Sequence, residues 1–246
     1  MGNKRALEKS QKAKAGKRLI PGIHNFCDRW CDRCTLTDRC SIFAFGKEEE
    51  RILSEGREAG SEMTGLVGTM LKDALRLLND LALEHGLENN PFADNHETDV
   101  LKEQDHYLLR TADDHADWMQ KWTDRNNLRI SSILSTLEET SGENYMLLKD
   151  AVEVLRWYMN FIVVKFSRAL YSGDTAQGAL SDSLGSAKIA LIAVDRSIES
   201  LRVLQKFISD DSGELKKGIG RLERIRKRAL KEFPGVMEFK RPGFDF

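Results

Sequence analysis

The chain has 246 residues, of which 41% are hydrophobic and 31% charged, and its formal net charge is -1. No stretch approaches the apolar length of a membrane span, and near neutrality argues against a dedicated nucleic-acid binder. The first eighteen residues carry seven basic side chains against one acid and no apolar run, which is unlike a secretory signal. We therefore expect a cytoplasmic protein.

Residues 1–20 read as a basic, flexible arm. Such an arm is usually a solvated terminus, and the alternative is a contact with nucleic acid or an acidic partner. After the arm, we expect a four-cysteine metal-binding knot at 21–46, a helical bundle at 47–233 and a tail at 234–246.

The cysteines are the strongest functional signal. All four fall within fourteen residues, at Cys27, Cys31, Cys34 and Cys40, with the spacing C-x3-C-x2-C-x5-C. In a reducing compartment, clustered cysteines indicate a metal site more often than disulfides. Four thiolates suit a [4Fe-4S] cluster or tetrahedral zinc. Structural zinc sites usually draw on two C-x2-C pairs and this window has one, so we place the cluster ahead of zinc.

Two families share part of this window. The segment Cys31-Asp-Arg-Cys34-Thr-Leu-Thr-Asp-Arg-Cys40 resembles the [4Fe-4S] loop of iron–sulfur DNA glycosylases, whose spacing is C-x6-C-x2-C-x5-C. Cys31, Cys34 and Cys40 match the last three ligands of that loop. Cys27 departs from the first ligand, because three residues separate it from the next cysteine where the loop has six. The resemblance implies cluster ligation, and it does not carry over DNA repair because the helix–hairpin–helix is not found. Cys27-x3-Cys31-x2-Cys34 is also similar to the radical-SAM signature, but the strands of that β/α barrel are not indicated.

The rest of the chain predicts an all-α fold, an antiparallel bundle of four to five long helices. Residues 92–233 contain no proline, strand signals are nearly missing, and apolar residues recur at helical spacing. The expected helices cover 47–85, 96–126 with a short extension at 128–137, 143–171, 179–208 and 213–233.

The second helix carries an acidic stripe. Glu103 and His106 resemble half of the Glu-x-x-His pairs of di-iron bundles, but no second pair exists, so the stripe is expected to be a solvated face. His115 lies on the opposite, apolar side, where a buried histidine is expected rather than a ligand.

The third and fourth helices carry charges on apolar surfaces. The third helix is apolar nearly all round and should be largely buried, so its charges need partners. Glu153, Lys165, Lys188 and Asp195 are candidates for a polar pocket that binds a small anionic ligand. The alternative is an ion-pair network between helices that fixes their register.

The fifth helix is strongly basic, with six cations within eleven residues. They are Arg221, Arg224, Arg226, Lys227, Arg228 and Lys231. Together with the arm, they are a candidate surface for nucleic acid or an acidic partner. The third and fourth helices and the ending Arg241-Pro-Gly-Phe-Asp245 resemble uncharacterised bacterial helical proteins with an N-terminal four-cysteine motif, and that resemblance implies no activity.

We expect a metal-binding helical protein that acts as a binding or structural module, in which the metal staples the N-terminal knot. A [4Fe-4S] redox or sensor protein is the first alternative. An enzyme with a pocket between the third and fourth helices is the second, although no nucleophile and base stand at motif spacing.

Overall fold

The computed structural model describes residues 19–58, 106–171 and 176–245, except for the side chains of 48–49, 52–58 and 176–180. Every helix or strand assigned in these ranges is a helix, which confirms the all-α class. The elements include short 3-10 helices, written η. In chain order they are η1 (Ile23–Asn25), η2 (Cys31–Arg33), η3 (Thr37–Arg39), α2 (Ser41–Glu58), α5 (Tyr107–Thr140), α6 (Gly142–Tyr171), α7 (Ala176–Phe207), η4 (Ser209–Asp211) and α8 (Ser212–Glu232).

The described residues divide into two compact units. The first contains residues 19–24 and 29–58, with η2, η3 and α2. The second contains Asn25–Asp28 together with residues 106–171 and 176–245, and therefore α5 to α8. Cys27 thus belongs to the second unit, whereas the other three cysteines belong to the first.

In the first unit, α2 begins earlier than predicted. It starts at Ser41, directly after the last cysteine, and not at Lys47. The Ala44 N–H donates a hydrogen bond to the Cys40 carbonyl (3.1 Å), so the first helical turn grows out of the cysteine window. The predicted continuation of this helix to His85 lies outside the described residues.

In the second unit, α5 is one unbroken helix. Its N-cap is His106, whose Nδ1 accepts a hydrogen bond from the Leu108 N–H (3.3 Å) and satisfies one free backbone donor. The predicted helix therefore does not pass through this residue, and 96–105 lie outside the described residues. The predicted extension over 128–137 is confirmed, because α5 continues to Thr140.

The other three helices closely match their predicted ranges. We expected 143–171, 179–208 and 213–233, and the structure has α6 at Gly142–Tyr171, α7 at Ala176–Phe207 and α8 at Ser212–Glu232. The apolar period and the absence of proline determine these helices, and Phe233 stands as C-cap just before Pro234.

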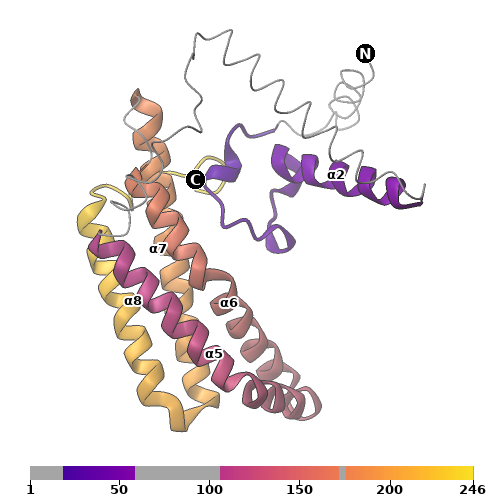
Figure 1. Ribbon diagram of the computed structural model, residues 1–246, viewed down its shortest axis with the longest axis vertical. Helices are drawn as coiled ribbons and strands as arrows, with labels where there is room; N and C mark the ends of the chain where they lie inside the picture. Colours follow the sequence, from indigo (N-terminus) through magenta and orange to yellow (C-terminus); the bar gives the residue numbers. More distant parts are fainter. Residues whose placement is uncertain (1–18, 59–105, 172–175, 246) are drawn as a thin grey trace. The chain divides into compact units, whose positions relative to one another are not determined.

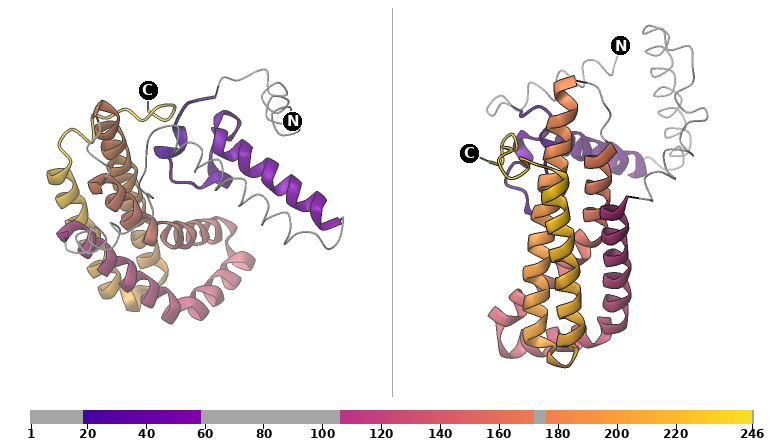
Figure 2. Two further views of the ribbon diagram at one scale, coloured as in Figure 1. Left: turned by 45° about the horizontal axis from the view of Figure 1, so that its top comes forward. Right: turned by 90° about the vertical axis from the view of Figure 1, so that its left-hand side faces the viewer.

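The four long helices pack in a cycle. α6 contacts α5 and α7, α7 contacts α8, and α8 contacts α5 (Figures 1 and 2). Burial of each large apolar side chain between them contributes roughly 1.5–3 kcal/mol. The largest fully buried side chains of this unit are Trp122, Tyr158, Phe166, Leu108, Met119, Ile130, Leu148, Ile162, Leu201, Leu204 and Ile208.

The expectation that the third helix is largely buried is only partly met. α6 buries one broad face, but Trp157 and Val164 are 40% and 63% exposed. A helix with two helical neighbours keeps an outward side, so an apolar sequence all round does not guarantee burial all round.

One glycine is required where α5 and α8 approach each other. A Cβ on Gly218 of α8 would stand 2.2 Å from Cη2 of Trp118 on α5, which is far inside contact distance. The indole therefore lies directly on the α8 backbone.

In the part of the chain that the structure describes, we find no helix both long and apolar enough to cross a membrane.

Candidate metal centre

The cysteine window is built from tight turns. Cys31 opens η2, and the Cys34 N–H closes it with a hydrogen bond to the Cys31 carbonyl (3.2 Å). η3 is closed in the same way by the Cys40 N–H, which donates to the Thr37 carbonyl (3.3 Å). Cys34 and Cys40 therefore each stand at the end of a 3-10 turn. The two turns fold the segment from Cys31 to Cys40 into a compact stretch.

The thiols of the first unit interact electrostatically. Partial burial, followed by the charges of the Cys34 and Cys40 thiolates, raises the pKa of Cys31 above its ordinary value. The Leu36 N–H also donates a hydrogen bond to the sulfur of Cys34 (3.4 Å). N–H donors of this kind stabilise thiolates and tune cluster sites. No disulfide joins any of the four cysteines, all of which are described.

The side chains of the described ranges do not form a ready metal cage. No group of three or more His, Cys, Asp or Glu side chains there is arranged to hold an ion. The donor set itself is nevertheless suited to a soft metal, because it consists of thiols in turns with an N–H directed at one sulfur. The metal site therefore remains a prediction from the sequence.

A strained residue stands between the first two cysteines. Arg29 has φ of 59°, the left-handed region that residues other than glycine seldom adopt. Its carbonyl accepts the Cys31 N–H (3.0 Å), so the chain turns sharply just before η2. Nearby, the guanidinium of Arg33 lies 3.8 Å from the centre of the Trp30 ring, a close cation–π contact.

The peptide that carries Cys27 is held by α6 and α7. The Asp28 carbonyl accepts a hydrogen bond from Nε1 of Trp157 (3.0 Å). Its carboxylate accepts one from the Tyr158 hydroxyl (2.7 Å) and one from Nη1 of Arg196 (3.1 Å). Arg196 donates to the Tyr158 oxygen as well. Burial, followed by the hydrogen bond to Asp28, raises the pKa of Tyr158 well above its ordinary value, so the phenol stays a donor.

The other end of this peptide is fixed too. Lys165 is only 6% exposed, and its Nζ donates a hydrogen bond to the Asn25 carbonyl (3.3 Å). Phe26 is buried against α7 at Gly185, where a Cβ would stand 2.2 Å from the phenyl ring. The Phe26 ring also lies 5.8 Å, centre to centre, from that of Phe239 in the C-terminal tail.

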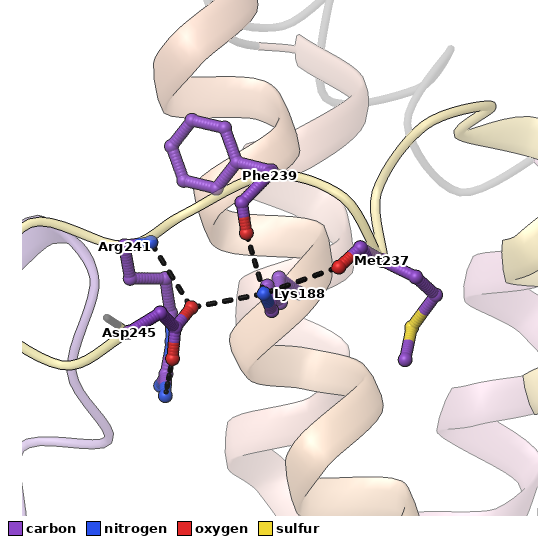
Figure 3. A network of polar contacts seen from close by, with 5 residues as sticks. All are labelled: Lys188, Met237, Phe239, Arg241 and Asp245. Atoms are coloured by element: carbon purple, nitrogen blue, oxygen red, sulfur yellow. Dashed lines mark hydrogen bonds and ion pairs between the residues drawn. The ribbon is translucent and has the colours of Figure 1, made fainter.

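Three of the four predicted pocket residues contact different parts of the second unit. Lys165 contacts the Asn25 carbonyl, and Lys188 contacts the C-terminal tail, as Figure 3 shows. Asp195 forms an ion pair with Arg226 of α8 (2.8 Å). Glu153 is half-buried. These contacts do not require a shared pocket, which stays a prediction. The ion pair of Asp195 instead follows the alternative, a link between helices.

The acidic stripe of the second helix is described only in part. Glu103 lies outside the described residues, and Nε2 of His106 is 3.6 Å from Glu232 of α8. His115 is 2% exposed, as the burial prediction requires. Burial, followed by the charge of Arg221, lowers its pKa from 6.5 to about 4, so it is neutral near pH 7.

The basic residues of α8 fall into two groups. Three are engaged within the unit: Arg221 stacks over Trp118 (5.4 Å), Arg226 pairs with Asp195, and Arg228 pairs with Glu232 (3.0 Å). The other three point outward. These exposed residues are Arg224, Lys227 and Lys231.

Sequence reasoning missed the anchoring residues. Asp28, Tyr158 and Arg196 were not among the predicted site residues. The one available signal was that Arg196 and Tyr158 place polar groups beside apolar stretches.

No protein-family model, curated protein or solved structure matches the chain.

Proposed function

We propose that the protein binds one metal centre through Cys27, Cys31, Cys34 and Cys40, with [4Fe-4S] ahead of zinc. The carrying observation is that the 3-10 turns η2 and η3 bring Cys31, Cys34 and Cys40 into one short folded segment, in which the Leu36 N–H donates to the Cys34 sulfur. Thiols that are closely spaced along folded turns suit a soft metal ion or cluster. The fourth ligand is Cys27, four residues before Cys31.

We propose further that the centre is structural and belongs to a binding module in the cytoplasm. The supporting observation is that α5 to α8 have a closed apolar core of their own. Ser141 alone separates α5 from α6, and residues 208–211 separate α7 from α8. Connections this short favour antiparallel neighbours, so the four helices are proposed to be an antiparallel bundle.

The test is metal analysis with an absorption spectrum on protein purified without oxygen. The proposal expects about four irons and four sulfides per chain, with visible absorption, as one cysteine per iron requires. Cys34→Ser should lose the metal, and Thr35→Ser, one residue away, should retain it. One zinc per chain supports the four-thiolate site and refutes the cluster. Absence of stoichiometric metal from the wild type refutes the proposal. Reversible bleaching on reduction would favour a redox or sensor role over a staple.

A second candidate role is binding of nucleic acid through α8 and the arm. The observation that favours it is the outward face of Arg224, Lys227 and Lys231, which share one side of α8 at spacings of three and four. Cations aligned in this way suit a row of phosphates, and each phosphate contact adds about 0.9 to the slope of log affinity against log salt.

This role is tested by salt-dependent binding to duplex DNA. Replacing Arg224, Lys227 and Lys231 by Gln should lower that slope by about 2–3, and deleting residues 1–18 should lower it further. A control with the same charge change replaces the exposed Lys121, Lys149 and Lys206 by Gln. Equal loss in both triple variants, or no binding at low salt, excludes α8 as the surface.

A further inference from the structure

The C-terminal tail folds back as a structured segment. Gly235, at φ of 80°, turns the chain after α8, and the N–H groups of Glu238 and Phe239 donate to its carbonyl (3.2 and 3.1 Å). Val236 is buried. The tail therefore has defined turns and an apolar anchor, although the sequence shows no helical period there.

Lys188 of α7 binds this tail at three points. Its Nζ donates to the carbonyls of Met237 (3.3 Å) and Phe239, and it forms an ion pair with the Asp245 carboxylate (2.9 Å), as Figure 3 shows. The Lys188 side chain is only 13% exposed. An amine so far removed from water needs this full set of acceptors, because an unpaired buried charge is costly.

The carboxylate of Asp245 is itself fixed within the tail. It accepts hydrogen bonds from the Arg241 backbone N–H (3.0 Å) and from Nη2 of Arg241 (2.8 Å). The hydrogen bonds from Arg241 and Lys188 hold the pKa of Asp245 well below its ordinary range. Lys188 and Arg241 thus hold the Asp245 carboxylate from two sides.

Phe239 connects this network to Cys27. Its carbonyl is bound by Lys188, and its ring contacts Phe26, which lies on the bare backbone of Gly185 one turn before Lys188. Phe26 is the residue directly before Cys27. The tail residue that Lys188 fixes is therefore also the residue that covers the Cys27 peptide.

We infer that the tail segment 236–245, locked by Lys188, is a clasp that holds Phe26 in place and thereby positions Cys27. These residues position a ligand and do no chemistry themselves. The part of the inference that concerns metal retention rests on the proposed metal centre. The positioning of Cys27 does not rest on it, since every contact involved joins protein groups alone.

The first experiment needs no metal. In a full-length chain with Cys31, Cys34 and Cys40 replaced by Ser, the alkylation rate of Cys27 by iodoacetamide is measured. Phe239→Ala and Lys188→Met should each raise this rate at least about fivefold, because Phe26 loses its cover or the tail loses its lock. Met237→Ala is the matched control, since this tail side chain is 51% exposed and only its backbone contacts Lys188. Circular dichroism checks that α5 to α8 remain folded.

If Lys188→Met unfolds the helices, Phe239→Ala alone decides, because it leaves the Lys188 network intact. An alkylation rate unchanged in folded Phe239→Ala, or raised equally in Met237→Ala, overturns the inference.

The second experiment uses the chain with all four cysteines and follows metal loss to a chelator. Release should be faster in Phe239→Ala than in the wild type and unchanged in Met237→Ala. If Phe239→Ala speeds Cys27 alkylation but the wild-type chain binds no metal, the clasp is supported and the metal centre is refuted. Normal alkylation with normal metal retention refutes the clasp and leaves the metal centre standing.

Discussion

His115 provides a pH-dependent test of how α5 packs against α8. The side chain is 2% exposed, Nδ1 has no hydrogen-bond partner among the described residues, and the ring lies 5.5 Å from that of Trp118. Its pKa is lowered to about 4 by burial and then by the nearby Arg221 charge, against 6.5 for an unperturbed histidine. Protonation in the folded state therefore requires bringing a charge into a dry site beside another cation.

The sign and size of the effect follow from linkage. Between pH 6.5 and about 4 the unfolded chain binds a proton at this residue and the folded chain does not, so stability falls as pH falls through this window. Each tenfold difference in proton affinity is about 1.4 kcal/mol, so the full effect is ~3 kcal/mol. Between pH 7.5 and 5.5 the His115 contribution is about 1 kcal/mol.

The assay is urea unfolding followed by circular dichroism at the two pH values. His115→Gln cannot titrate, so its free energy of unfolding should fall by about 1 kcal/mol less than that of the wild type between pH 7.5 and 5.5. Trp118→Phe is the control: it loosens the same contact, keeps the histidine and should preserve the wild-type pH dependence. If wild type and His115→Gln lose equal stability, the histidine is not a buried neutral group and the reasoning fails.

Three further predictions concern packing and backbone. Gly218→Ala should lower the free energy of unfolding by about 1–3 kcal/mol because the added Cβ would clash with the Trp118 indole. The control is Gly220→Ala, which should raise the free energy of unfolding by up to ~1 kcal/mol because no atom lies nearer than 3.8 Å to its Cβ. Equal effects of the two substitutions would refute the close approach of Trp118 to Gly218. Tyr158→Phe should cost about 1–2 kcal/mol through its lost carboxylate hydrogen bond, and the exposed Tyr107→Phe should cost nothing measurable. Arg29→Val should cost about 1–2 kcal/mol more than Arg29→Gly, since φ is positive there; thermal melts showing no difference would contradict that strain.

The helices could be predicted because the signal is local. The apolar period of residues 143–171 gives a helix whatever it packs against, and α6 begins and ends within one residue of that range. The start of α2 could not be predicted in the same way. Ser41 follows the turn that contains Cys40. The helix begins there because the Cys40 carbonyl accepts the first helical hydrogen bond, from the Ala44 N–H.

The partners of the charged residues could not be predicted. Lys188 and Asp195 are seven residues apart, so the sequence correctly places them on one face of a helix, but periodicity does not say which element that face meets. In the structure Asp195 meets Arg226 of α8, and Lys188 meets a tail with no periodic pattern. Asp28 and Tyr158 are 130 residues apart and need the whole fold to meet.

The anchoring of Asn25–Asp28 bears directly on what kind of metal ligand Cys27 would be. Ordering four residues costs roughly 1–2 kcal/mol each in backbone entropy. Burial of Phe26 and the hydrogen bonds from Trp157, Tyr158, Arg196 and Lys165 together contribute a similar amount. The contacts with α6, α7 and the tail therefore offset most of the entropy cost of ordering this peptide. A proposed ligand held in this way would keep its position when a neighbouring thiol is oxidised or protonated. This argues that metal loss should leave α5 to α8 folded, in contrast to small zinc domains that unfold without their ion.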